Sequence, residues 1–535
     1  MADTAARDES MVAALHHALP QILPEFLITR RWFGGKARVI ESVEIADVVP
    51  IGAWYLVLAR IKYASGPPEM YHIPLGTVPH SFDTGLDQDS MMRFRGEKSA
   101  DEYLLADAML DEEFLGCLLD TIIRGARFPG TLGVLQAVST SALGALLESS
   151  KESLSPSVMN AEQSNSSVVY GRHLVLKIFR RVEAGLNPDL EIGSFLTRKA
   201  SFRNVPAVAG SLEYVSQQGT STSLAVLQAY VPNQGDAWQF TLNALREYYA
   251  RAQKAGFAPD EIPQAPILEL AGEPVPDEVG QRIGPYLDSA RLLGRRTAEL
   301  HLALASEKYE PAFTPVPFSP DERQAFVSSA LRLLKSNFDL LRHHKNAMQE
   351  FIRQDVQRVL GHEEKARRRL GHLAEHNISA MVTRIHGDYH LGQVLFTGSD
   401  FVIIDFEGEP ARPLEERRKK RSPLQDVAGM LRSFHYAAYA PLLQSSSASG
   451  TADQNLQVLA GAASYWQRWV SATFLKTYLE VARGAQFIPE SKEELVILLD
   501  AFLLDKAVYE LGYELNNRPS WVRIPLDGIT QLLER

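Results

Sequence analysis

Two aspartates and a glutamine stand in this chain at a spacing that suits phosphate chemistry. Asp388 precedes Gln393 by five residues, and Asp405 follows the apolar run 402–404. An aspartate can orient an acceptor hydroxyl and receive its proton, while Mg²⁺ takes carboxylate and carbonyl oxygens as ligands. Phosphoryl transfer asks a protein for positioning and charge neutralisation more than for covalent chemistry. The pattern predicts Asp388 as the catalytic base and Gln393 and Asp405 as Mg²⁺ ligands.

Each of these residues alone has a plainer interpretation. A single aspartate in such a stretch is usually a turn or cap residue. The ordered set beside strand-like apolar runs favours the chemical interpretation instead. We interpret His386 as a structural residue that braces the loop by hydrogen bonds, and His390 as a residue that could face phosphate.

A lysine inside an apolar strand also needs an explanation. Lys177 follows the apolar run 174–176, and burying a charge without a partner is costly. The α- and β-phosphates of ATP would provide a partner, and Glu191 on the following helix would hold the ammonium in place. The alternative is that Lys177 lies on the exposed face of an edge strand.

The polar stretch 162–167 lies where a phosphate-binding loop would be, although it has no G-x-G-x-x-G pattern. Small hydroxyl and amide residues can still present N–H donors to phosphate, but an ordinary polar turn fits equally well. Residues 228–231 are the candidate hinge, where adenine would pair with main-chain groups. The predicted nucleotide contacts in these two segments are Ser164, Asn165, Ser166, Gln228, Tyr230 and Val231.

One helical face near the C-terminus suits a sugar. Lys506, Tyr509, Tyr513 and Asn517 are spaced i, i+3, i+7 and i+11, so they share a face. Aromatic rings would stack on the sugar, and polar tips would bond to its hydroxyls. A half-buried helix whose tyrosine hydroxyls find local partners fits the same spacing.

A basic run, residues 417–421, follows the metal-ligand candidate Asp405. The first interpretation is a solvated loop balanced by Glu415, Glu416 and Asp426. The second is a cationic rim near the nucleotide or a partner surface.

The elements that must position these residues fall into three regions. Residues 1–95 form a strand-rich N-terminal cap, residues 96–232 an intermediate region and a kinase-like N-lobe, and residues 233–535 a helical C-lobe with the catalytic loop, metal site and sugar site. The fold class is therefore α+β: a bilobal protein kinase-like fold with an N-terminal cap. Helices are expected from about 11, at 102–119, 188–197, 291–304, 321–341, 348–370, 456–483 and 493–513, and strands at 43–49, 54–63, 69–75, 167–171, 174–179, 224–231, 393–396 and 401–404.

Composition excludes several function classes. The 535 residues carry a net charge of −10 and a pI of about 5.8, so no general nucleic-acid or anionic-membrane binding is expected. The single cysteine, Cys117, allows no internal disulfide and fits a reducing compartment. The polar N-terminus is not a secretory signal, and the apolar stretch 132–147 is too short and too polar to span a bilayer. We expect a cytoplasmic protein.

Read together, these residues resemble the bacterial maltokinases, which look like aminoglycoside phosphotransferases with an added N-terminal cap. The resemblance spans nearly the whole chain, and the strings in the cap and at 423–434 are the most specific to that branch. The matching strings are 31–36, 163–169, 187–192, 232–238, 384–395, 404–410, 421–434 and 513–519.

The resemblance implies a reaction, its cofactors and a partner. It implies phosphorylation of maltose by ATP, with Mg²⁺, at the anomeric hydroxyl. The product, maltose 1-phosphate, would feed α-1,4-glucan synthesis from trehalose, with trehalose synthase as a plausible partner. Arg432 joins Lys506, Tyr509 and Tyr513 as expected sugar contacts. Insertions relative to stand-alone members are expected at 246–285 or 445–455.

Two other functions stay open. The acceptor could be glucosamine, another sugar or an aminoglycoside, because residues 430–520 do not reveal acceptor fit. A non-catalytic scaffold for a trehalose-converting enzyme is disfavoured because Lys177, Glu191, Asp388 and Asp405 are all present.

Overall fold

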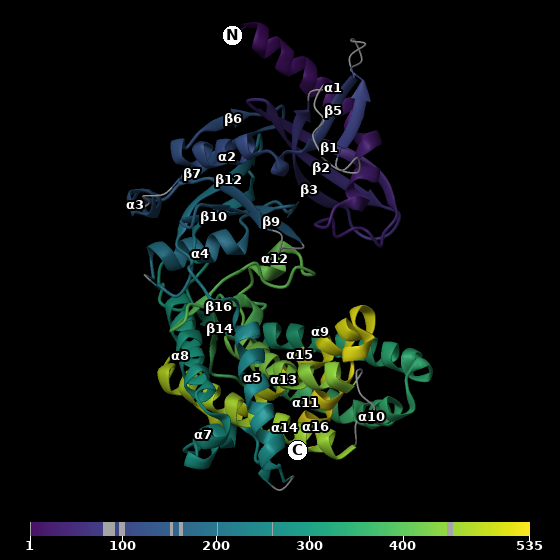
Figure 1. The fold of residues 1–535 in the computed structure, drawn as a ribbon, viewed down its shortest axis with the longest axis vertical. Coiled ribbons are helices and arrows are strands. Elements are labelled where there is room, and N and C mark those ends of the chain that lie inside the picture. Colours follow the sequence, from purple (N-terminus) through teal and green to yellow (C-terminus); the bar gives the residue numbers. More distant parts are fainter. Residues whose placement is uncertain are drawn as a thin grey trace. The chain divides into compact units, whose positions relative to one another are not determined.

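The structure, a computed structural model, describes residues 2–78, 91–95, 102–149, 153–159, 164–200, 202–258, 261–446 and 453–534. These residues form two compact units. Unit 1 comprises Met1–Arg198 and Pro206–Pro232, and unit 2 comprises Lys199–Val205 and Asn233–Arg535. Unit 1 is rich in strands and unit 2 is mainly helical (Figure 1), as the α+β prediction requires. The predicted boundary at residue 96 lies outside the described residues, and the division into three regions stays a prediction.

Unit 1 begins with a helix, α1 (Ala2–Thr29), and an antiparallel cap sheet in the order β1-β2-β3-β5-β4, with β11 also paired to β3. Gly52, at φ 61°, lies in the two-residue turn between β1 and β2, where a positive φ favours glycine. The predicted cap strands are confirmed. The strands are β1 (Ile40–Ile51), β2 (Trp54–Tyr63), β3 (Glu69–Val78), β4 (Met91–Arg95), β5 (Glu102–Asp107) and β11 (Arg181–Val182).

Helix α1 packs one apolar stripe against the cap sheet. Leu15, Leu19 and Leu23, each four residues apart, are fully buried there. Residues Ser10–Thr29 are also long and apolar enough to cross a membrane by length and composition alone. The packing against the cap gives these apolar residues a place in a protein core, so the composition is weak evidence for a membrane span. The cytoplasmic location stays a prediction.

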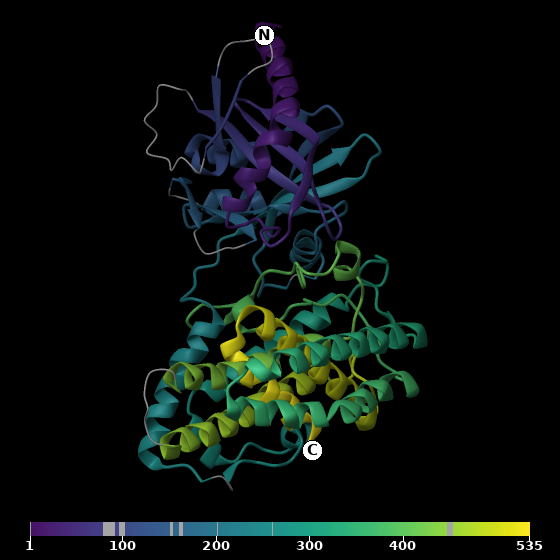
Figure 2. The same ribbon diagram turned by 90° about the vertical axis from the view of Figure 1, so that its right-hand side faces the viewer.

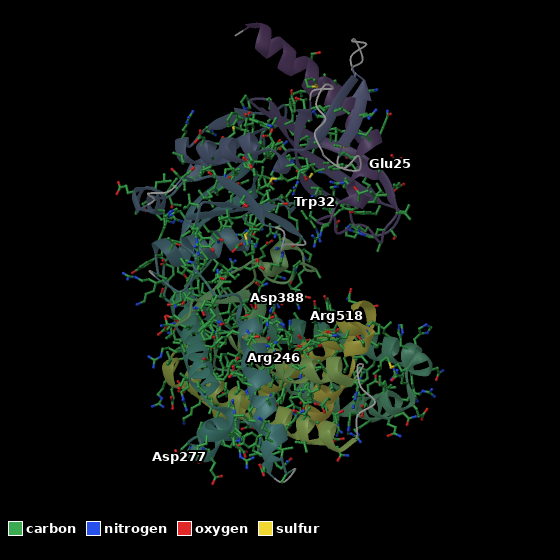
Figure 3. All side chains as sticks on the ribbon, viewed as in Figure 1. Glu25, Trp32, Arg246, Asp277, Asp388 and Arg518 are labelled. Carbon is green, nitrogen blue, oxygen red and sulfur yellow. The ribbon has the colours of Figure 1, made fainter. Side chains whose placement is uncertain are left out.

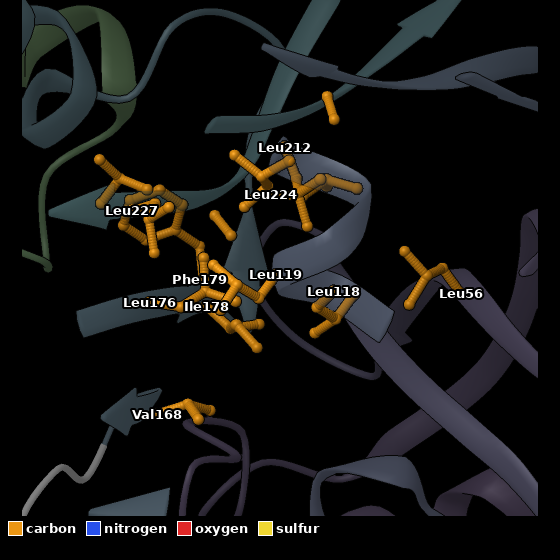
Figure 4. Packing of buried hydrophobic residues seen from close by; sticks show 14 of the residues in the cluster. Leu56, Leu118, Leu119, Val168, Leu176, Ile178, Phe179, Leu212, Leu224 and Leu227 are labelled. Carbon is orange, nitrogen blue, oxygen red and sulfur yellow. The ribbon is translucent and has the colours of Figure 1, made fainter. Parts of the chain in front are cut away.

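A second antiparallel sheet in unit 1 has the order β6-β7-β12-β13-β10-β9-β8. One core cluster joins its apolar face to α2 and to the cap strands; Leu118, Leu176 and Leu227 are among its members (Figure 4). The predicted strands 167–171, 174–179 and 224–231 and the helix 188–197 are confirmed within a few residues. The elements are β6 (Arg127–Pro129), β7 (Gly133–Ser139), β8 (Pro156–Met159), β9 (Asn165–Tyr170), β10 (Leu174–Phe179), β12 (Val208–Ser216), β13 (Ser221–Ala229), α2 (Glu112–Arg124), α3 (Ser141–Ser149) and α4 (Pro188–Arg198).

The helix predicted over 102–119 is wrong in its first half. Residues 102–107 form strand β5, and α2 starts only at Glu112. Asp111 caps α2 by accepting hydrogen bonds from the N–H groups of Glu113 and Phe114. The short apolar run 103–106 is compatible with the period of a helix and with that of a strand. Its pairing with β3 and β4 makes it a strand.

Unit 2 is a helical body in which α9, α11 and α15 lie side by side (Figures 1 and 2). Its core includes Phe338, Leu370 and Leu511, all fully buried. The helix predicted over 348–370 is two helices that meet at His362. The first predicted insertion, 246–285, covers α6, α7 and the end of α5. Of the second predicted insertion, 445–455, residues 447–452 lie outside the described part of the chain. The helices are α5 (Ala237–Ala255), α6 (Ile267–Gly272), α7 (Asp277–Ile283), α8 (Tyr286–Leu304), α9 (Pro320–His344), α10 (Glu350–Gly361), α11 (Glu363–Glu375), α12 (Leu414–Arg417), α13 (Leu424–Ser446), α14 (Asp453–Val481), α15 (Lys492–Asn517) and α16 (Arg523–Leu533).

A short hairpin is set into this helical body. Strands β16 (Val394–Phe396) and β17 (Phe401–Ile403) pair antiparallel, and the 3₁₀ turn η5 (Leu391–Gln393) precedes them. Phe396 stacks on Phe240 of α5 with ring centroids 4.1 Å apart. The hairpin is therefore fixed to a helix, and it holds Gln393 before its first strand and Asp405 after its second.

Candidate active site

The lysine predicted to bind phosphate lies on β10 in unit 1. Its neighbours in the sheet are β9 and β13, so Lys177 stands in a central strand and not at an edge. Its side chain is only 9% exposed, and Nζ donates to Oδ2 of Asp189 at 3.0 Å. Asp189 is itself 1% exposed. A buried ion pair fixes the ammonium, so the edge-strand alternative is excluded.

Sequence reasoning missed Asp189. The residue lies in the first turn of α4, and its N–H donates to Oδ1 of Asn187 just before the helix. The segment Asn-Pro-Asp held the signal, because proline and acids are favoured where a helix begins. Glu191 lies in the same first turn and is buried, and its predicted role at Lys177 stays a prediction.

Strand register decides how the predicted phosphate residues point. Lys177 lies opposite Ser167, and Ile178 lies opposite Ser166. Directly paired residues share a face and successive residues alternate, so Ser166 lies on the face opposite Lys177. Its Oγ accepts a hydrogen bond from Nε of Arg180 at 2.8 Å. A phosphate contact from the Ser166 side chain is therefore a prediction that the structure corrects, whereas Asn165 shares the Lys177 face.

The remaining predicted nucleotide residues lie at the two ends of this sheet. Ser164 is exposed just before β9, and Gln228, the second-last residue of β13, lies opposite Val175. The N–H of Tyr230 donates to the carbonyl of His173 at 2.8 Å, so it is already used within the protein. Val231 is half-buried, and its contact with adenine stays a prediction.

The catalytic loop in unit 2 is held by one face of α13. Asp426, Gly429 and Ser433 follow the helical spacing i, i+3, i+7. Asp426 accepts from the N–H groups of residues 386 and 387 at 2.7 and 2.9 Å, and Oγ of Ser433 accepts from the N–H of Leu391 at 3.1 Å. A Cβ on Gly429 would lie 2.6 Å from the carbonyl oxygen of Tyr389. The loop thus lies directly on the helix backbone.

The electrostatics of Asp426 keep this anchor charged. Burial alone would raise its pKa, but hydrogen bonding and charge interactions with His301 and nearby groups lower it below the ordinary value. Asp426 was expected to balance the basic run 417–421, and the structure corrects that interpretation. The signal lay in the string 423–434, where a polar or small residue recurs at helical spacing among apolar neighbours.

The two histidines of the loop have local partners. Nε2 of His386 lies 2.9 Å from the carbonyl oxygen of Ile404, which confirms its structural role. Nδ1 of His390 accepts from the N–H of Gly392 at 3.1 Å, and burial lowers the pKa of His390. A neutral His390 is therefore favoured, and a contact with phosphate through it stays a prediction.

The two predicted Mg²⁺ ligands are brought together by the hairpin. Nε2 of Gln393 donates to Oδ2 of Asp405 at 2.8 Å. Asp405 has a φ of 65°, the one positive φ of a non-glycine residue in the described part of the chain, and such strained backbone often marks a functional position. The carbonyl oxygen of Gln393 and the carboxylate of Asp405 are hard oxygen donors, so the pair fits Mg²⁺ chemically.

The predicted acceptor face of α15 reaches the catalytic aspartate. Nζ of Lys506 lies 3.4 Å from Oδ1 of Asp388 (Asp388 is labelled in Figure 3). Nζ of Lys506 also lies 5.0 Å from the centroid of the Tyr509 ring, and burial together with the charges of Glu409 and Asp388 raises the pKa of Tyr509. Tyr513, one turn further, is 46% exposed. The structure therefore assembles Asp388, Lys506 and Tyr509 and leaves Tyr513 at the surface.

Arg432 does not belong to the exposed acceptor face. It is 4% exposed on α13, and its Nη2 forms an ion pair with Glu510 at 2.7 Å. Glu510 is one turn beyond Lys506 on α15, so Arg432 reaches the site only through Glu510. The prediction of a direct sugar contact is corrected, because the side chain is enclosed between α13, α15 and α16, where a Cβ on Gly528 would collide with it.

A lysine strand with an acidic helix, followed by a catalytic loop and a metal-acid hairpin, is the arrangement of a kinase-like phosphotransferase. Comparisons with known proteins agree. Residues 26–111 match the model of the maltokinase N-terminal cap domain. The glucosamine kinase of Mycolicibacterium smegmatis is 24% identical over 381 residues, covering 70% of this chain and 79% of that protein. That of Streptacidiphilus jiangxiensis is 23% identical over 380 residues, covering 70% and 72%.

Solved structures share the fold. A glucosamine kinase in crystal form B has a TM-score of 0.64 at 17% identity and covers 98% of this chain and 99% of its own. A glucosamine kinase in complex with glucosamine, ADP and inorganic phosphate has a TM-score of 0.59 at 18% identity, with 95% and 96% covered. The chain is a phosphotransferase with the fold of these glucosamine kinases. Within that class its N-terminal residues 26–111 resemble the cap domain of maltokinases.

Proposed function

We propose that this protein is a sugar kinase that transfers the γ-phosphoryl group of ATP to a sugar hydroxyl. The observation that carries the proposal is the assembly of Asp388, Lys506 and the Gln393–Asp405 pair within unit 2. The glucosamine kinases found as relatives support a sugar acceptor, and the ADP in one solved structure supports a nucleotide donor.

In the proposed mechanism Asp388 accepts a hydrogen bond from the acceptor hydroxyl and takes its proton as the new O–P bond forms, while the bond from the γ-phosphorus to the bridging oxygen breaks and ADP leaves with that oxygen. Lys506 lies beside that carboxylate, with Nζ 3.4 Å from Oδ1, and helps to orient it. Gln393 and Asp405 would hold Mg²⁺, which when bound neutralises phosphate charge. Lys177, fixed by Asp189, would bind the phosphates of ATP in unit 1.

Two acceptors have separate support. Glucosamine comes first, because two relatives whose matches each cover 70% of this chain are glucosamine kinases. Maltose comes second, because the cap matches the maltokinase cap model and the sequence strings resemble maltokinases; its product would be maltose 1-phosphate. Trehalose synthase as a partner stays a prediction from that resemblance.

A sugar panel separates these acceptors. The purified protein is incubated with MgATP and glucosamine, maltose, glucose or an aminoglycoside, and ³¹P and ¹³C NMR locate the phosphorylated carbon. We expect a product from glucosamine; a product from maltose at the anomeric carbon would reverse the order of the two. If none of these acceptors is phosphorylated, the proposed substrate class is contradicted.

A further inference from the structure

Arg180, directly after β10, joins the cap to β9, the strand that follows the predicted phosphate loop. Arg180 comes directly after β10, and the next two residues leave that sheet to form β11 on cap strand β3. The carbonyl of Arg180 accepts from the N–H of His72 on β3 at 2.7 Å. The main chain that carries the phosphate lysine therefore continues into the cap sheet.

The side chain of Arg180 turns back from the cap to β9. Its Nε donates to Oγ of Ser166 at 2.8 Å, and its Nη2 forms an ion pair with Asp107 of the cap at 2.9 Å. The side chain is 1% exposed. Because a buried guanidinium is restrained by each of these partners, a displacement of the cap would also displace Ser166.

The guanidinium also lies over an aromatic ring of the cap. Its central carbon is 4.6 Å from the centroid of Trp32, which is labelled in Figure 3. Trp32 begins a packed motif in which Phe33 is buried against Tyr71 with ring centroids 5.1 Å apart. A Cβ on Gly35 would lie 2.6 Å from the Phe33 ring, so this position needs a glycine. The motif therefore holds Trp32 firmly under Arg180.

Ser166 is well placed to receive this restraint. It lies on the core face of β9, two residues after the exposed Ser164 and one before Ser167, which faces Lys177. Holding Ser166 from behind fixes where β9 begins, and with it the main-chain N–H groups that would point at phosphate.

We propose that Arg180 is a positioning residue through which the cap, by way of Trp32 and Asp107, sets the geometry of the phosphate-binding strand and so the affinity for ATP. This inference rests on the proposed function, because it assumes that the nucleotide phosphates bind near β9 and Lys177. The cap is then a working part of the nucleotide site and not an appended module.

The test compares nucleotide affinity and kinetics in variants of the full chain. We expect Arg180→Met to raise both the Kd for ADP and the KM for ATP by about tenfold, the size of one lost charge-assisted hydrogen bond. The kcat at saturating ATP and the KM for the sugar should stay within about twofold, because the side-chain contacts of Arg180 are with the cap and β9. Trp32→Leu should shift the same two constants in the same direction by a few-fold, and Arg180→Lys should restore part of the affinity.

A double-mutant cycle tests the path through Ser166. If Arg180 acts through that hydroxyl, Ser166→Ala combined with Arg180→Met should weaken ADP binding by clearly less than the product of the two single effects. Tyr214→Phe is the matched control. It removes another buried hydrogen bond between cap and second sheet, from the tyrosine hydroxyl to Asp47 at 2.7 Å, at a place remote from β9.

Each outcome decides between specific alternatives. A wild-type protein that binds no ADP would overturn the proposed function and the inference with it. Wild-type binding that is unchanged in Arg180→Met, or weakened equally in Tyr214→Phe, would overturn the inference alone. The inference would also be overturned if Arg180→Met lowered kcat and the melting temperature and raised both KM values together, because that pattern marks a purely structural residue. If Arg180→Met does not fold, Trp32→Leu and Ser166→Ala carry the same comparison.

Discussion

At the scale of residues, each unit holds candidate groups whose charged or polar partners limit what each group can do. Asp388 faces the ammonium of Lys506, Lys177 faces Asp189, and Gln393 donates to Asp405. These pairs orient the groups before any ligand arrives, which is how preorganised electrostatics lowers the barrier for a charged transition state.

The role of Asp388 can be tested by one isosteric change. Asp388→Asn keeps the size of the side chain but cannot take a proton, so we expect kcat to fall by roughly a thousandfold or more with ADP binding nearly unchanged. Steady-state turnover and calorimetric ADP titration measure the two quantities. Turnover close to wild type in this variant would remove Asp388 from its proposed role.

Asp505, next to Lys506, should show a pH-dependent effect on stability. Burial raises its pKa to about 6, above its ordinary value, so the folded protein binds its proton more tightly than the unfolded chain does. The resulting contribution to stability is complete below about pH 4 and is lost as the pH rises through about 6.

Asp505→Asn removes this titration. Relative to wild type, the variant should gain on the order of 2 kcal/mol in unfolding free energy between pH 4 and pH 7. Urea unfolding of both proteins at several pH values measures the difference. A difference independent of pH would contradict the raised pKa.

At the scale of elements, α13 decides where the catalytic loop lies. Its face of Asp426, Gly429 and Ser433 receives the loop backbone, while Arg432 on another side joins α13 to Glu510 of α15. One helix thus fixes the loop with Asp388 and, through Glu510, the helix with Lys506. The distance between those two side chains is therefore set by helix packing.

Gly429→Ala tests this close approach. The added Cβ would lie 2.6 Å from the Tyr389 carbonyl, so loop and helix must separate. We expect a loss of about 1–3 kcal/mol in stability and a fall in kcat of at least tenfold, measured by thermal unfolding and turnover. The control is Gly116→Ala inside α2, where a Cβ meets nothing within 4 Å; it should leave kcat unchanged and add up to about 1 kcal/mol.

At the scale of the whole molecule, the chain folds into two units whose stabilities need not be equal. In unit 1, the fully buried Asp47 of cap strand β1 accepts hydrogen bonds from the N–H groups of Thr131 and Leu132 and from the hydroxyl of Tyr214. This carboxylate ties the cap sheet to the second sheet, and without it the buried hydroxyl of Tyr214 would lose its acceptor.

Asp47→Ala should therefore weaken unit 1 selectively. We expect a loss of about 3 kcal/mol, seen by hydrogen exchange as faster exchange in β1, β7 and β12. Protection in α13 and α15 of unit 2 should change little, because local stability is set by each cooperative unit. Equal loss of protection throughout would show that the two units unfold together.

The sequence alone determined the chemical groups and most local elements. The order of Lys177, Asp388, Gln393 and Asp405 indicated phosphoryl transfer, and the strands of the cap and of the Lys177 sheet followed from apolar runs between turns. Such features depend on residues that are close together in the chain, so they can be predicted from the sequence. The strand at 102–107 was missed because its short apolar run fits two periods equally.

Only the tertiary structure decided which groups meet. Lys177 pairs with Asp189, and Asp426 binds the backbone of the catalytic loop. Arg432 is buried against Glu510, and Ser166 accepts from Arg180. Such pairings join residues far apart in the chain or depend on the register of a strand, where one step moves a side chain to the other face. Packing and burial select among the available partners, and no local pattern records that choice.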